Sequence, residues 1–185
     1  MREIYEPRED SFLLSRVLKE KLPELLQKNP DLKFLEIGCG SGINLKTALE
    51  SGVKKENIFG GDINPKAVEH CRGLGFNCVE SDLFENLDER FDVIVFNPPY
   101  LPEDEKEPLN SRRETTGGKK GNEIIIRFLE QAKNYLAGNG KIFLITSSLA
   151  EEVDFSEFGF REKIISSKKL FFEELFVWEL ELEKK

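Results

Sequence analysis

The sequence predicts an α/β fold built on one sheet whose strands are mostly parallel. The first basis is an apolar segment at residues 32–37 that runs into a glycine-rich turn and a helical pattern, the start of a nucleotide-type βαβ unit. The second is an apolar run at 91–96, broken only by Asp92, which is typical of a buried parallel strand. The third is a pair of strand-like segments at 160–167 and 175–182 with no helix between them, which predicts a C-terminal antiparallel hairpin.

Length and charge narrow the class of protein. A chain of 185 residues is expected to form one domain, residues 1–185, with a helical segment at 1–30 packed on it. The net charge of −8 disfavours unassisted binding to a nucleic-acid backbone. The charged first residues show no signal peptide, and no apolar run approaches the roughly 18 residues of a membrane span. We therefore expect a cytoplasmic protein that does not enter a membrane.

The remaining helices and strands are predicted from the spacing of apolar residues along the chain. A helical pattern begins near Glu9, with acids in its first turn, and Pro23 is expected to kink or split it. Residues 101–120 show no periodicity and are expected to form a lid or substrate loop, with a solvated charged loop as the alternative. Further strands are expected at 57–62, 76–80 and 141–146, and helices at 43–51, 65–72, 122–136 (ended by Gly138) and 149–156.

Polar side chains stand at the ends of four predicted strands, namely Glu36, Asp62, Asp82 and Asn97. Because the carboxyl ends of parallel strands open on one edge of a sheet, we expect these residues to share a ligand site. Asp62 follows the glycines by about 20 residues, where a carboxylate can accept hydrogen bonds from both hydroxyls of a ribose. The pattern therefore indicates a nucleoside-containing ligand.

The tetrapeptide Asn97-Pro98-Pro99-Tyr100 follows the predicted strand at 91–96. Neither proline has an N–H group, so the backbone offers carbonyl acceptors beside the amide oxygen of Asn97. Such an acceptor-rich strand end suits a ligand that brings N–H groups, and Tyr100 adds an aromatic wall. Taken alone, the tetrapeptide is equally compatible with a plain end of a strand.

The ordered set of motifs resembles the class I S-adenosylmethionine (SAM) methyltransferases, which have a Rossmann-like fold. The resemblance rests on EIGCGSG at 36–42, acids at 62 and 82, NPPY at 97–100 and the terminal hairpin. It implies a seven-stranded, mostly parallel sheet of strand order 3-2-1-4-5-7-6. The segments YEPREDSFLL at 5–14 and TGGKKGNEIIIRFL at 116–129, without a long N-terminal extension, are similar to the short archaeal and eukaryotic branch of HemK-type protein-glutamine N5-methyltransferases. Enzymes of that family methylate the Gln of the GGQ motif of class I release factors.

The resemblance implies a role for each matching residue. Asn97, Pro98, Pro99 and Tyr100 form the catalytic tetrapeptide, in which the Asn97 side-chain oxygen and the Pro98 carbonyl accept the two N–H groups of the substrate amide. The cofactor is SAM. Its expected binding residues are Ser11, Glu36 and Gly38 at the methionine part, Asp62 at the ribose, Asp82 and Leu83 at the adenine, Gly40 and Gly42 in the close turn, and Asn97.

Other functions remain open from the sequence. An adenine N6 or guanine N2 methyltransferase of DNA or RNA can use the same tetrapeptide, although the negative charge makes nucleic acid an unfavourable partner. A protein-lysine methyltransferase is a further alternative, but a lysine ammonium must first lose a proton. A scaffold that binds SAM without catalysis is the non-enzymatic alternative.

The resemblance also implies a protein partner, because the family branch works with a small zinc-binding activator. We expect that activator to add a strand to the open edge at residues 76–80 and to form a heterodimer with this chain. No metal site is expected in this chain, because Cys39, Cys71 and Cys78 lack metal-ligand spacing and are expected to be reduced thiols. The single histidine, His70, is expected at the surface.

Overall fold

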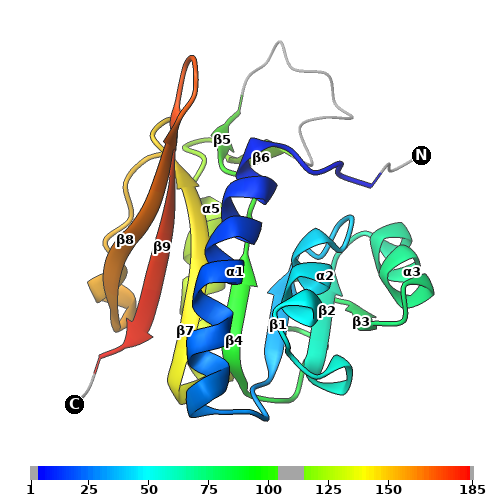
Figure 1. The fold of residues 1–185 in the computed structure, drawn as a ribbon. Helices are drawn as coiled ribbons and strands as arrows, with labels where there is room; N and C mark the ends of the chain where they lie inside the picture. The colour runs from blue at the N-terminus through cyan, green and yellow to red at the C-terminus, as the bar shows by residue number, and fades with distance from the viewer. Residues whose placement is uncertain (1–3, 104–114, 184–185) are drawn as a thin grey trace.

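The computed structural model describes residues 4–103 and 115–183. Within them, seven strands form one sheet in the order β3-β2-β1-β4-β7-β9-β8 (Figure 1). In chain order these are the third, second, first, fourth, fifth, seventh and sixth strands, so the expected order is confirmed. The strands are β1 (Phe34–Ile37), β2 (Ile58–Asp62), β3 (Asn77–Glu80), β4 (Phe91–Phe96), β7 (Leu136–Ser147), β8 (Phe160–Lys169) and β9 (Glu174–Leu182).

The central strands run parallel and the last two form the expected hairpin. β1 pairs in parallel with β2 and β4, β2 with β3, and β4 with β7. β9 runs antiparallel to both β7 and β8. All four residues of β1 are buried, as a strand covered on both faces requires. The predicted α/β class with a mostly parallel sheet is therefore confirmed.

Helices cover both faces of the sheet (Figure 1). One apolar cluster joins the sheet to α1 (Glu9–Lys28), α2 (Ile43–Glu50) and α3 (Pro65–Gly73). A second cluster joins the opposite face to α5 (Glu123–Tyr135). Helix α1 continues through Pro23 as one helix, so it is not split there. The three layers leave the carboxyl edge of the sheet open.

Two local expectations were wrong, and a third is only partly tested. Residues 149–156 do not form a helix; a short 3-10 helix at Phe155–Phe158 follows instead, with Phe155 buried in the second cluster. β7 begins at Leu136, directly after α5, so Gly138 lies inside a strand and does not end a helix. Within the expected loop at 101–120, β5 (Leu101–Pro102) pairs with β6 (Thr116–Gly118). The rest of that expected lid, 104–114, lies outside the described residues.

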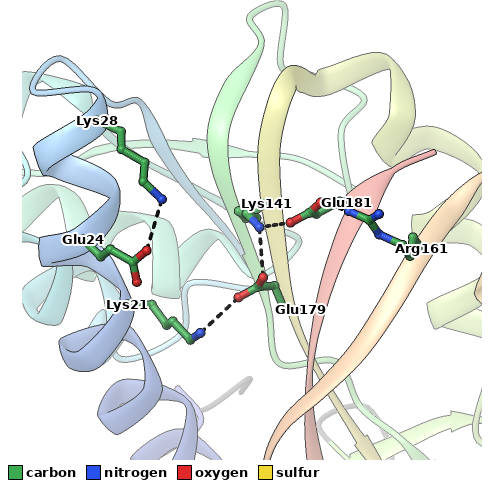
Figure 2. Close-up of polar contacts among 7 residues, drawn as sticks. All are labelled: Lys21, Glu24, Lys28, Lys141, Arg161, Glu179 and Glu181. Carbon is green, nitrogen blue, oxygen red and sulfur yellow. Dashed lines mark hydrogen bonds and ion pairs between the residues drawn. The ribbon is translucent and has the colours of Figure 1, made fainter. Parts of the chain in front are cut away.

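A chain of ion pairs fastens α1 to the antiparallel side of the sheet (Figure 2). Lys21 of α1 lies 3.4 Å from a Glu179 oxygen, and Lys141 of β7 lies 2.9 Å from the other oxygen of that carboxylate. Lys141 also pairs with Glu181, whose second oxygen contacts Arg161. Because neighbouring ion pairs share residues, the network joins four elements, α1, β7, β9 and β8, at little entropic cost per contact.

No helix among the described residues is both long and apolar enough to cross a bilayer.

Candidate active site

A cleft of about 1320 Å³ opens at the carboxyl edge of the parallel strands. The four polar residues expected at the strand ends, Glu36, Asp62, Asp82 and Asn97, all line it. These residues lie together because the carboxyl ends of parallel strands are at the same edge of the sheet. The cleft is also lined by the remaining expected site residues except Gly42, namely Ser11, Gly38, Gly40, Leu83, Pro98, Pro99 and Tyr100.

The glycine-rich turn after β1 is held in a left-handed conformation that glycine adopts without strain. Gly38, Gly40 and Gly42 have φ values of +68°, +46° and +75°. The Gly40 N–H donates to Oδ2 of Asp62 at 2.9 Å, and the Asn64 N–H donates to Oδ1 at 2.8 Å. The turn and Asp62 therefore form one rigid unit, and each oxygen of a carboxylate can accept from more than one donor. Gly42 stands behind the cleft, where an added Cβ would lie 3.1 Å from the sulfur of Cys71.

Glu36 is a buried carboxyl group with one oxygen left unsatisfied. Its Oε1 accepts from the Asn44 side chain at 2.7 Å, whereas its Oε2 has no hydrogen-bond partner. Burial raises the pKa of Glu36 well above its ordinary value, and the Asn44 contact offsets only part of that rise. A cationic ligand that donates N–H groups would satisfy the orphan oxygen and favour the ionised form.

Asn97 carries a second buried acceptor without a partner. Its Oδ1 is buried and accepts no hydrogen bond, although buried amide oxygens are normally paired. The strand that precedes it, β4, lies beside β1, with Phe96 in register with Ile37. Two orphan acceptors therefore stand at the ends of neighbouring strands in one cleft, and the unpaired Oδ1 of Asn44 lies in the same lining. A ligand rich in N–H groups could satisfy such acceptors.

Asp10 is a site residue that the sequence reasoning missed. Its buried carboxylate accepts from the hydroxyls of Tyr5 at 3.0 Å and Tyr100 at 3.3 Å, and from the Ser11 N–H at 2.6 Å. It thereby ties the first turn of α1 to the NPPY tetrapeptide. Burial and then the Asp10 charge raise the pKa of Tyr100 above its usual range, so Tyr100 remains a neutral donor. The signal was present in YEPREDS, but acids in a first helical turn were read as helix-dipole partners.

The end of β3 forms the far wall of the cleft. Leu83 is the one non-glycine residue with positive φ, +53°, among the described residues, and the Ser81 hydroxyl donates to its carbonyl at 2.9 Å. Such a backbone is held only where the surroundings impose it, and it occurs often at ligand sites. Asp82 accepts from Arg127 of α5 at 2.9 Å, a partner that no sequence pattern indicated.

Glycines also allow the chain to pack tightly behind NPPY. A Cβ on Gly117 would lie 2.6 Å from the Pro99 carbonyl oxygen, and one on Gly121 would lie 2.5 Å from that of Tyr100. Because backbone atoms cannot move aside cheaply, both positions require glycine. The TGG segment at 116–118 therefore supports the tetrapeptide from behind.

Comparisons with known proteins agree with this geometry. The family model described as the methyltransferase small domain matches residues 14–169. A Methanocaldococcus jannaschii protein named as a protein N5-glutamine methyltransferase is 41% identical over 187 residues, covering 95% of this chain and 90% of that protein. The eRF1 methyltransferase catalytic subunit mtq2 of Schizosaccharomyces pombe is 30% identical over 168 residues, covering 77% of this chain and 72% of that one.

A solved structure shows the same fold over the whole chain. The E. cuniculi Mtq2–Trm112 complex, described as responsible for methylation of the eRF1 translation termination factor, matches with a TM-score of 0.68 and 25% identity. The match covers 99% of this chain and 100% of that one. The expected family, fold and enzyme class are confirmed: this chain belongs to the methyltransferase small-domain family and, within it, to the protein N5-glutamine methyltransferases.

Proposed function

We propose that this protein transfers a methyl group from SAM to the side-chain amide nitrogen of a glutamine, the Gln of the GGQ motif of a peptide chain release factor. The observation that carries the proposal is the pair of buried, unpartnered acceptors, Glu36 Oε2 and Asn97 Oδ1, in one cleft. One suits the ammonium group of an amino-acid cofactor, and the other suits a primary amide.

The cleft fits SAM part by part. Ser11, Glu36 and Gly38 hold the methionine part, and Asp62 accepts the ribose hydroxyls. Asp82 and Leu83 flank the adenine, while Gly40 lets the backbone approach closely and Gly42, behind the cleft, permits the turn. When bound, SAM supplies a methyl group on a positively charged sulfur that is already activated, so no nucleophilic side chain is required.

The tetrapeptide positions the substrate amide. An amide nitrogen is a poor nucleophile because its lone pair is delocalised into the carbonyl group. Asn97 Oδ1 and the Pro98 carbonyl accept its two N–H groups, which fixes its orientation and stabilises the positive charge that grows on nitrogen. Pro99 and Tyr100 form the adjoining wall. Alignment of this kind is worth several kcal/mol, up to about 7–11 kcal/mol in model reactions.

Release factors are favoured over other acceptors by the relatives and by charge. Both the S. pombe protein and the E. cuniculi complex are named for methylation of eRF1. A net charge of −8 disfavours the adenine N6 and guanine N2 alternatives on nucleic acid. The lysine alternative suits Asn97 and Pro98 less well, because two acceptors match the two N–H groups of a primary amide. We place the activity in the cytoplasm, where translation terminates, and in a single domain spanning 1–185.

Transfer of labelled methyl groups tests the substrate. A class I release factor should be labelled, its GGQ→GGA variant should not be, and nucleic acid should remain unlabelled. Labelling of the GGA variant would move the acceptor to another residue, and labelling of nucleic acid would favour the nucleobase alternative.

Replacing Asn97 with Ala tests the role of the tetrapeptide. We expect methyl transfer to fall at least about 100-fold, as when one charge-stabilising group is removed from an active site, with SAM affinity changed much less. Calorimetry measures SAM affinity, and single-turnover labelling measures transfer. An unchanged transfer rate with SAM bound would remove Asn97 from the mechanism.

A protein partner completes the proposal. We propose that a small zinc-binding activator adds a strand to β3 and that the functional unit is a heterodimer. The E. cuniculi relative is described as a complex with Trm112, which supports a partner of this kind. The zinc of that partner is distinct from any ion on this chain.

A further inference from the structure

Three cysteines far apart in the sequence meet at one point beneath the glycine-rich turn. Cys39 lies in the turn after β1, Cys71 in α3 and Cys78 in β3. Their sulfur atoms all lie within 4.8 Å of one another, and the three side chains are at most 6% exposed. All three are free thiols. The sequence spacing predicted no such cluster, because three separate elements bring the thiols together.

The neighbouring strand leaves room for the sulfur atoms. A Cβ added to Gly60 of β2 would lie 2.9 Å from Cys78 Sγ and 3.3 Å from Cys39 Sγ, too close for either to stay in place. A Cβ on the next residue, Gly61, would meet nothing nearer than 3.7 Å. A glycine in a strand interior often marks such a close approach. The space between the thiols is therefore kept open by a glycine.

We propose that Cys39, Cys71 and Cys78 form a binding site for one soft divalent cation of the Zn²⁺ class. Thiolate sulfur is the preferred protein ligand for such ions, with a bond of about 2.3 Å. Tetrahedral bonds of that length place sulfurs roughly 3.8 Å apart, so each sulfur needs to move by less than about 1 Å. Among the described residues, no fourth side chain joins the group, and the fourth position falls to water.

Charge and access are consistent with this site. Binding releases three thiol protons and leaves three thiolates around a divalent ion, a net charge of −1. Arg72 lies alongside, with its Nε donating to the Cys78 carbonyl at 2.8 Å, and its guanidinium offsets that charge. Cys78 also lines a surface hollow of about 380 Å³ beside β3, which gives an ion and its water a route inward.

The site adjoins the cofactor turn and shares Cys39 with the lining of the cleft. Cys71 Sγ donates to the Gly40 carbonyl at 3.5 Å, and Cys39 is itself part of the turn. A bound ion would therefore fasten the turn to α3 and β3. This role is independent of which acceptor the enzyme methylates.

Titration with metal under anaerobic, reducing conditions tests the proposal. Full-length protein should bind one equivalent of Zn²⁺, and Cd²⁺ should give the ultraviolet charge-transfer band of thiolate ligands. Cys71→Ser and Cys78→Ser should each weaken binding about 100-fold or more, beyond the effect of losing an outer partner. Absence of binding by the wild-type protein, or equal binding by the serine variants, would overturn the site.

Two glycine variants distinguish a specific loss of the metal site from a loss of binding caused by misfolding. Gly60→Ala keeps all three thiols but places a methyl group among them, and it should weaken Cd²⁺ binding at least tenfold. Gly61→Ala alters the same strand without entering the cluster and should bind as the wild type does. Circular dichroism confirms that each variant is folded, and equal binding by both would contradict the geometry.

Discussion

Three buried carboxyl groups near the cleft differ in how they are satisfied. Asp10 accepts hydrogen bonds from two phenol hydroxyls and a backbone N–H group. Asp62 accepts hydrogen bonds from two backbone N–H groups. Glu36 accepts one hydrogen bond from the side-chain amide of Asn44, and its second oxygen has no partner. Because an unpaired buried charge is costly, Asp10 and Asp62 are built as parts of the framework, while Glu36 depends on its ligand.

The ribose contact gives a first prediction at this scale. Asp62→Ala should weaken SAM binding by about 1–3 kcal/mol, because it removes charge-assisted hydrogen bonds to two hydroxyls and frees the glycine turn. Isothermal calorimetry measures the change. Asp88→Ala, at an exposed acid outside the cleft, serves as the control. Wild-type SAM affinity in the Asp62 variant would remove that residue from the ribose site, and NAD binding would favour an oxidoreductase.

Glu36 gives a pH dependence whose sign follows from its raised pKa. Below that pKa the carboxyl group is neutral, and a cationic ammonium loses its counter-charge. SAM affinity should therefore rise as pH increases through the Glu36 pKa and level off above it. Proton release on binding, measured by calorimetry in buffers of different ionisation enthalpy, checks the sign. Glu36→Gln should bind more weakly at high pH and lose the slope, and a slope retained in that variant would assign it to another group.

The residues missed from sequence share a physical reason. The Tyr100–Asp10 contact spans 90 positions, and the Arg127–Asp82 contact spans 45. No local propensity encodes such pairs, because they exist only once helices have packed on the sheet. Glu36, Asp62, Asp82 and Asn97 could be predicted because each lies within two residues of the end of a strand, and the topology of a parallel sheet brings strand ends together.

At the element scale, the sequence predicted strands buried on both faces better than the segments that join them. β4 was placed at its observed bounds because six largely apolar residues stand between polar turns. β7 was placed five residues too late, since Gly138 and Gly140 resemble a loop although the backbone there is already extended. The helix expected at 149–156 was wrong for a related reason, because that segment also joins two elements. Phe155 is apolar because it packs in the core, and it does not belong to the apolar face of an amphipathic helix.

The two edges of the sheet differ in how they resist pairing. β8 carries the charged residues Arg161, Glu162, Lys163, Lys168 and Lys169, which discourage another strand from joining. β3 is four residues long, has no proline and lies beside the hollow lined by Phe59, Arg72, Phe76, Asn77, Cys78 and Val79. The partner proposed above therefore belongs on β3.

A matched pair of substitutions tests that choice of edge. Val79→Asp places a charge in the hollow beside β3 and should weaken the heterodimer at least tenfold, because a carboxylate would lose its water on binding. Ile164→Asp makes the same kind of change on β8, where the side chain is 46% exposed, and should leave the complex intact. Co-purification with the activator and SAM affinity are measured for both. Loss of the complex only in the Ile164 variant would move the interface to β8.

At the scale of the whole molecule, the tip of the β8–β9 hairpin extends beyond the rest of the sheet (Figure 1). Leu170 and Glu173 line the cleft, and between them Phe171 and Phe172 are 91% and 82% exposed. Their rings contact each other edge to face at 4.5 Å between centroids. Exposed aromatic pairs are uncommon on a monomer surface and favour a protein contact. A release factor is large enough to touch this tip while its glutamine lies in the cleft.

Substitutions at the hairpin tip therefore test recognition of the whole release factor without changing recognition of its glutamine. The double variant Phe171→Ser with Phe172→Ser should raise KM for the release factor about tenfold, since burying two aromatic rings is worth at least 1–2 kcal/mol, roughly one decade of affinity. kcat, SAM affinity and the methylation of a short GGQ peptide should stay unchanged, because none of them depends on the tip. Leu49→Ser, at an exposed apolar residue of α2 outside the cleft, provides the control. Equal losses with the protein and the peptide would show that the tip supports the site itself, and no loss with either would place the release factor elsewhere on the surface.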